Sequence, residues 1–165
     1  MPYDLQRFKD AQERDYATAL AEIRAGRKTT HWIWYVFPQL QGLGRSAMCV
    51  RYGIDGPGEA EAYLVDPTLR ARLVEVSRAL LALGGNDPVA VMGRIDARKL
   101  RSCMTLFSRA EGADPAFEAV LAKYFGGEPD PLTLAMLGQE SGQDAWDAAE
   151  SFMEEYAEVF EELAK

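Results

Sequence analysis

The sequence is poor in the residues that build covalent or metal-linked scaffolds. Its only two cysteines, Cys49 and Cys103, are too few for a disulfide framework or a cysteine-based zinc site. A single histidine, His31, excludes a histidine-rich metal cluster. We therefore expect reduced thiols, no bound metal and no other cofactor.

Long apolar runs are also absent. No stretch of about 18 apolar residues occurs, which a membrane-spanning helix would need. The first 15 residues mix charges of both signs and lack the basic and then apolar segments of a signal peptide. Internal repeats and low-complexity linkers are missing too. These absences predict a cytoplasmic protein with no membrane partner.

The remaining composition is that of a globular domain. Of the 165 residues, 48% are hydrophobic and 27% are charged, which argues against disorder across the whole chain. A chain of this length buries enough surface to be stable without covalent cross-links. We predict a single compact domain.

Four Asp-Pro pairs each precede an apolar segment. Aspartate accepts hydrogen bonds from the free N–H groups in the first turn of a helix. Proline, which has no N–H group, is suited to the first helical position. Helices are therefore predicted to begin at Asp66-Pro67, Asp87-Pro88, Asp114-Pro115 and Asp130-Pro131.

The spacing of apolar residues supports a helical fold. They recur every three or four positions over 5–23, 68–83, 95–107 and 117–125, and again between Trp146 and Leu163. No window alternates strictly between apolar and polar residues, as a half-buried strand would. We expect an all-α, compact single domain of about seven to nine short helices. The aromatic run 31–37 is too short for its periodicity to decide between strand and helix.

Charge is distributed unevenly along the chain. The net charge is -8, yet no acid occurs between Glu22 and Asp55, a stretch that carries five basic residues. Residues 94–109 hold five basic residues against one acid, whereas 144–165 hold eight acids against one lysine. The overall negative charge disfavours nucleic acid as a partner. The aromatic residues in the first basic stretch keep single-stranded nucleic acid as a less favoured alternative.

Several segments together are similar to one bacterial family. They are DLQRF (4–8), HWIWYVFPQLQGLGRS (31–46), KLRSCMTLF (99–107) and KYFGG (123–127) followed by Asp130 and Thr133. With this string of matches, residues 3–138 resemble the "domain of unknown function 1810" family. The resemblance implies a mainly α-helical fold, and a helix for the run 31–37. It implies no activity, and the label calpastatin, sometimes attached to members, names a disordered repeat inhibitor that this composition does not match.

The resemblance divides the chain into two parts. Residues 1–138 form the family-like helical domain. We expect residues 139–165 to form an acidic C-terminal helix, which packs on this domain or extends from it.

His31 is the first candidate for chemistry. A free imidazole titrates near pH 6.5, which suits proton transfer. It opens the aromatic run, so we name it as the candidate catalytic residue. A histidine at the start of a helix can equally be a capping or packing residue.

The glycine-rich turn at 42–47 is the second candidate. It formally fits a dinucleotide-binding fingerprint, but Pro38 before it and the glycines at 53–58 after it do not suit a strand followed by a long helix. What remains is Arg45 beside a helix start at Ser46, where an anion can bind. A tight turn that only needs backbone freedom is the alternative.

The predicted helix 95–107 carries a polar ridge. Lys99 and Ser102 share one face, Arg101 lies on another, and the apolar residues form the core face. Such a ridge can hold a phosphate or a carboxylate, although a solvated basic face has the same pattern. Cys103 lies near these cations but falls on the apolar face, where a cysteine is usually a small core residue.

Together these candidates suggest a cleft where segments 31–46 and 95–107 meet. Its ligand would be an anionic small molecule, plausibly with a phosphate group, and the protein would be its binder or an enzyme acting on it. The candidate ligand-binding residues are Trp32, Trp34, Arg45, Ser46, Lys99, Arg101 and Ser102. The alternative is a non-catalytic module that meets a protein partner through its acidic C-terminal helix.

Overall fold

The computed structural model describes residues 3–138, and within this range it contains nine α-helices and no β-strand. The expected all-α fold is confirmed. The helices are α1 (Gln6–Arg24), α2 (Ile33–Val36), α3 (Ala47–Arg51), α4 (Gly56–Val65), α5 (Pro67–Ala82), α6 (Pro88–Met92), α7 (Arg94–Ser108), α8 (Pro115–Phe125) and α9 (Pro131–Met136). The acidic helix and the boundary predicted at 138/139 lie outside the described residues.

All four Asp-Pro pairs begin helices, as predicted. In α5, α6, α8 and α9 the proline is the first helical residue, and the preceding aspartate accepts a hydrogen bond from a backbone N–H group of the first turn. These bonds are 2.9 to 3.1 Å long. The capping aspartate and the proline after it therefore favour these four starts locally, and contacts with distant residues support Asp66, Asp114 and Asp130 in addition.

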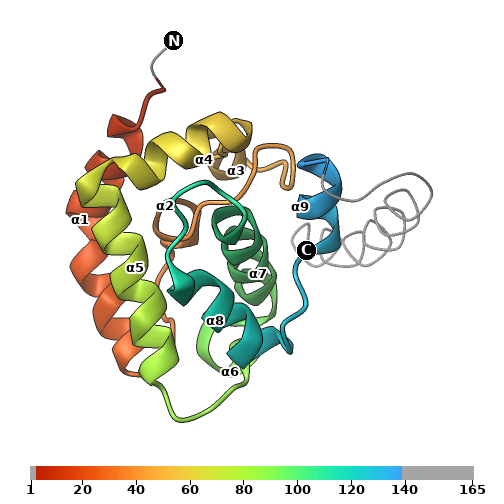
Figure 1. The fold of residues 1–165 in the computed structure, drawn as a ribbon. Helices are drawn as coiled ribbons and strands as arrows, with labels where there is room; N and C mark the ends of the chain where they lie inside the picture. The colour runs from red at the N-terminus through yellow and green to blue at the C-terminus, as the bar shows by residue number, and fades with distance from the viewer. Residues whose placement is uncertain (1–2, 139–165) are drawn as a thin grey trace.

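Helix α7 lies at the centre of the domain (Figure 1). It packs against α2, α4, α6, α8 and α9, while α1 and α5 lie side by side along one flank. Its apolar face, with Leu100, Cys103, Met104 and Phe107, is fully buried. Residues 102–107 are all buried, so α7 reaches the surface mainly through its first half, which carries Arg94, Arg98, Lys99 and Arg101.

The aromatic run 31–37 is helical, as the resemblance implied, but for one turn only. Helix α2 covers Ile33–Val36, and Phe37 leaves the helical conformation with φ −125° and ψ 73°. A proline disfavours the helical conformation of the residue before it, and Pro38 follows directly. The run thus ends in an extended segment that carries Gln39 and Leu40 into the interior.

Helix α4 was not predicted. Its sequence starts with Gly-Pro-Gly, which obscures a helix start. The stabilising contact is the side chain of Glu59, which reaches back and accepts a hydrogen bond of 2.8 Å from the N–H group of Asp55. Within residues 3–138 no helix combines the length and the apolar character needed to cross a membrane.

Candidate functional site

The predicted segments 31–46 and 95–107 meet at the contact between α2 and α7. The ammonium group of Lys99 lies 5.5 Å from the centre of the Trp34 ring. Between α2, α3 and α7 a narrow cavity remains, with room for about one water molecule. We call it the Trp34–Lys99 cavity; the residues that matter in its lining are Ile33, Trp34, Gln39, Met48, Cys49 and Lys99.

Two residues of this lining carry a polar atom that has no partner within residues 3–138. The indole Nε1 of Trp34 and the amide Oε1 of Gln39 are buried without a hydrogen bond to any described residue. Gln39 as a whole is only 7% exposed. A buried donor or acceptor left without a partner costs about 1–3 kcal/mol. Such groups are rare in native proteins and often mark a place for water, an ion or a ligand.

The charge beside the cavity is positive. Asp96, in the first turn of α7, forms ion pairs with Lys28 at 2.8 Å and with Lys99 at 3.9 Å. The ammonium of Lys28 also lies 4.9 Å from the centre of the Trp32 ring. One carboxylate thus gathers two ammonium groups next to two tryptophans. Lys28 was not among the predicted site residues, although it belongs to the acid-free stretch.

The indole N–H group of Trp32 has a hydrogen-bond partner, whereas that of Trp34 has none among the described residues. Its indole N–H donates to the carboxylate of Glu22 at 3.0 Å. The same carboxylate accepts the backbone N–H groups of Thr29 and Thr30 at 2.7 and 2.9 Å and the hydroxyl of Thr30 at 2.6 Å. Burial by itself raises the pKa of Glu22, but these donors outweigh it and lower the pKa to about 2. Trp32 is therefore fixed as part of the loop that leads into α2.

Arg7 fixes the backbone of residues 51–53, and two of these residues, Tyr52 and Gly53, line the cavity. Its guanidinium donates to the carbonyls of Arg51 and Gly53 at 2.9 and 3.0 Å and pairs with Glu59 at 3.0 Å. At Gly53, which lines the cavity, a Cβ atom would lie 2.7 Å from the Cα of Gln41, so no larger residue fits there. Sequence analysis missed Arg7 and Glu59, because a pair separated by 52 residues leaves no local signal.

Arg101 and Ser102 lie at another face of α7. Arg101 donates to the carbonyls of Glu128 and Pro129 at 3.0 and 3.1 Å. Ser102 is fully buried, and its hydroxyl lies 3.2 Å from Oδ2 of Asp130, the residue that caps α9. These contacts fasten α9 to α7. Neither residue lines the Trp34–Lys99 cavity, so the predicted ridge is divided between two places.

Asp130 is buried, and its two carboxyl oxygens differ in their hydrogen bonds. Oδ2 accepts from Ser102 and from the N–H group and hydroxyl of Thr133, whereas Oδ1 is buried without a described partner. Burial raises the pKa of Asp130, against these hydrogen bonds and the charge of Arg101, which lower it. Asp130 and Thr133 thus serve first as a helix cap.

His31, Arg45 and Ser46 are exposed and do not line the Trp34–Lys99 cavity. Ser46 caps α3, accepting the N–H group of Cys49 at 3.2 Å, so the predicted helix start is confirmed. The carbonyl of His31 lies 3.3 Å from the hydroxyl of Tyr35. No contact of the imidazole tests the catalytic role, which stays a prediction.

Cysteine and metal chemistry find little support among the described residues. Cys103 is fully buried, and burial raises the pKa of its thiol well above the usual range, so it is a poor nucleophile. Within residues 3–138 no group of three or more His, Cys, Asp or Glu side chains is placed to hold a metal ion.

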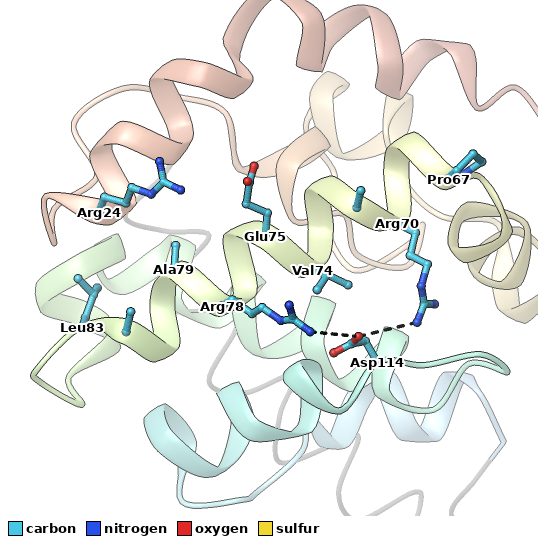
Figure 2. Close-up of a pocket in the computed structure, with 11 residues that line it drawn as sticks. Arg24, Pro67, Arg70, Val74, Glu75, Arg78, Ala79, Leu83 and Asp114 are labelled. Carbon is cyan, nitrogen blue, oxygen red and sulfur yellow. Dashed lines mark ion pairs between the residues drawn. The ribbon is translucent and has the colours of Figure 1, made fainter.

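A wider groove of about 790 Å³ runs along α5 (Figure 2). Arg70 and Arg78 both point toward Asp114 there, with ion pairs of 3.8 and 4.0 Å. Asp114 also caps α8, and Glu75 accepts a hydrogen bond from Tyr16. These charged groups are engaged with one another in joining α5 to its neighbours, so we do not assign a ligand to this groove.

Comparisons with known proteins agree with this fold. Residues 2–137 match the model of a family described as "Protein of unknown function (DUF1810)". The crystal structure of a conserved hypothetical protein from Mycobacterium tuberculosis is 47% identical and superimposes with a TM-score of 0.81, covering 84% of this chain and 99% of that chain. No curated protein gave a match. The chain therefore belongs to the family of the domain of unknown function 1810, as its sequence segments indicated.

Proposed function

We propose that the protein binds a small anionic molecule at the Trp34–Lys99 cavity, with one carboxylate or phosphate oxygen seated in it. The observation that carries this proposal is a pair of buried atoms, Trp34 Nε1 and Gln39 Oε1, that have no partner within residues 3–138 and belong to two residues that line the cavity together with Lys99. An anionic oxygen accepts hydrogen bonds from an indole N–H and an ammonium group, and such charge-assisted bonds are the stronger kind.

Gln39 adapts the cavity to its ligand. Its terminal amide offers an acceptor in one orientation and two N–H donors after a half-turn. The first orientation suits a ligand that also carries a hydroxyl or amine, and the second suits a bare anion. Because the cavity has room for about one water molecule, only the anionic tip enters it, and the body of the ligand lies outside.

The positive charge favours an anion over a neutral ligand. Lys28 and Lys99 together exceed the charge of Asp96 by one, and their side chains are only 6% and 15% exposed. Partial burial reduces the screening of these charges by solvent and salt. Met48 forms part of the wall, and its flexible thioether chain can give way when a ligand enters.

Binding is the core of this proposal, and catalysis is an extension of it. His31, three residues before Trp34, stays the candidate for proton transfer. The anionic cleft as first expected also included Arg45, Ser46, Arg101 and Ser102. Of all the ligand-binding residues first expected, only Trp34 and Lys99 are supported as direct ligand contacts by the contacts described above. Trp32 has a structural role, because its indole N–H group is bonded to Glu22.

The test is a ligand screen by thermal shift, followed by calorimetric titration. The panel contains inorganic phosphate, sugar phosphates, nucleoside monophosphates and small carboxylates. A ligand at about 100 times its Kd stabilises the protein by about 2.7 kcal/mol. The stabilisation should disappear in Lys99→Met, which keeps the apolar stem, and persist in Lys9→Met, a surface lysine of α1 paired with Asp66.

Two results would overturn the proposal. One is a panel in which no anion stabilises the wild-type protein. The other is a ligand whose affinity is the same in Lys99→Met and in the wild type, because its site would then lie elsewhere.

A further inference from the structure

A second groove, of about 230 Å³, opens where α6, α7, α8 and the start of α9 meet. We call it the arginine groove, and its relevant lining residues are Val89, Arg94, Arg98, Arg101, Phe125 and Asp130. It shares no lining residue with the Trp34–Lys99 cavity. An inference about it is therefore independent of the proposed function.

The groove combines a line of positive charge with an apolar rim. Arg94, Arg98 and Arg101 are spaced four and three residues apart, so they follow one face of α7. Val89 is 50% exposed and gives the rim of the groove an apolar side chain. The ring of Phe125 lies 6.0 Å from the guanidinium of Arg101. A peptide with acids and aromatic residues interleaved complements such a surface.

The same chain contains a segment of that kind. Residues 139–165 carry nine acids and one lysine. Phe152, Tyr156 and Phe160 are interleaved with these acids at intervals of four. We propose that the arginine groove is the docking site of the acidic segment 139–165.

The covalent connection favours docking within one molecule. Asp130 borders the groove, α9 follows it directly, and the described chain continues to Gly138. The remaining 27 residues reach about 90 Å when extended, so every part of this domain is within range. A tethered segment has an effective concentration in the millimolar range, so even a weak contact is populated.

The contact is reversible and salt-dependent. Arg101 keeps its positive charge while it binds the carbonyls of Glu128 and Pro129, so all three arginines of the groove contribute charge toward the peptide. Exposed ion pairs are individually weak and are screened by salt. An anionic partner with stronger contacts can therefore displace the segment, which makes the groove a regulated interaction surface.

The first experiment measures binding in trans. A fluorescent peptide of residues 139–165 is titrated into a chain that ends at Gly138. That shortened chain is expected to fold, because a solved relative folds at nearly the same length. The match covers 99% of the relative and 84% of this chain. We expect saturable binding that weakens by about tenfold or more when NaCl rises from about 50 to about 500 mM.

Matched variants locate the site. Arg94→Gln with Arg98→Gln should weaken binding by about tenfold or more, whereas Arg70→Gln with Arg78→Gln, on the α5 groove, should leave it unchanged. Three outcomes overturn the proposal: no binding at about 100 µM protein, equal loss in both double variants, or equal binding of a scrambled peptide. If an unrelated acidic peptide binds and the peptide of residues 139–165 does not, the groove serves another partner and the proposal is wrong.

A second experiment uses the full chain and needs no truncation. A glutamate-specific protease should cleave within 139–165 at least about threefold faster in the Arg94→Gln/Arg98→Gln variant than in the wild type, because docking protects the segment. Equal rates would refute the proposal. A full-chain dimer that dissociates in this variant would place the segment in the groove of a second copy and overturn docking within one molecule.

Discussion

Lys99 and Trp34, 65 residues apart in the sequence, face each other with 5.5 Å between the ammonium group and the ring centre. This contact joins two of the segments that identify the family. It also places a cation against the ring of a tryptophan whose buried indole N–H group has no partner among the described residues. The pair is the centre of the proposed anion site.

Replacing Trp34 separates function from stability. Trp34→Phe removes the unpartnered N–H group and keeps an aromatic ring, so the lost packing is offset by relief of a cost of about 1–3 kcal/mol. We expect the free energy of unfolding to stay within about 1 kcal/mol of the wild type while anion binding is lost. Urea unfolding and calorimetric titration measure the two effects.

Trp32→Phe is the matched control. It removes an indole N–H group that is bonded to Glu22, so the free energy of unfolding should fall by about 1–3 kcal/mol. If Trp34→Phe destabilises the protein as much as Trp32→Phe, the N–H group of Trp34 has a structural partner and the site proposal loses its basis.

The Arg7–Glu59 pair is predicted to be a main stabilising contact. Arg7→Met would leave the carboxylate of Glu59, whose side chain is 3% exposed, without its cation. Breaking a buried ion pair costs about 3–5 kcal/mol. Urea unfolding should show this loss, whereas Glu13→Gln, which removes an 81% exposed partner of Arg72, should change stability by less than about 1 kcal/mol.

Glu22 should make part of the stability depend on pH. Its pKa is about 2 in the folded protein, below the ordinary value of 4.5, so the folded state binds fewer protons than the unfolded state. Its contribution is complete above about pH 4.5 and is lost as the pH falls toward 2. The difference in unfolding free energy between wild type and Glu22→Gln should therefore be constant near neutral pH and shrink over this interval. A difference that stays constant down to pH 2 would contradict the prediction.

Asp114 tests how much a helix cap contributes compared with an ion pair. Asp114→Ala removes both the cap of α8 and the partner of Arg70 and Arg78 (Figure 2), and should cost about 1–2 kcal/mol. Asp114→Asn keeps a capping oxygen and loses only two long ion pairs, so it should cost less than about 1 kcal/mol. Thermal unfolding of the two variants compares them directly, and equal losses would show that charge outweighs capping.

The alternative of a protein-interaction module retains a role in this picture. The acidic segment 139–165, which was expected to meet a protein partner, is assigned in our proposal to the arginine groove of its own chain. Binding of an external acidic partner would then compete with it. Nucleic acid remains the less favoured ligand, because the net charge of -8 opposes it.

Sequence patterns predicted well those features that depend on neighbouring residues. The starts at Asp66, Asp87, Asp114 and Asp130 are set by a side chain and the N–H groups two or three positions later. The core face of α7 follows from helical spacing. Helix α4 was missed because its first residues are glycine and proline, while the carboxylate that stabilises its start is also fixed by the distant Arg7.

The candidate site was only partly predictable for the same reason. The sequence by itself determined the all-α fold, because capping and periodicity act over a few positions. Its matching segments indicated the family and the residue types near the site. Only the tertiary structure decided that Lys99 joins Trp34 and Gln39 while Arg101 and Ser102 fasten α9. A helix turns by about 100° per residue, so neighbours on α7 face different partners, and packing of the whole domain determines which partners those are.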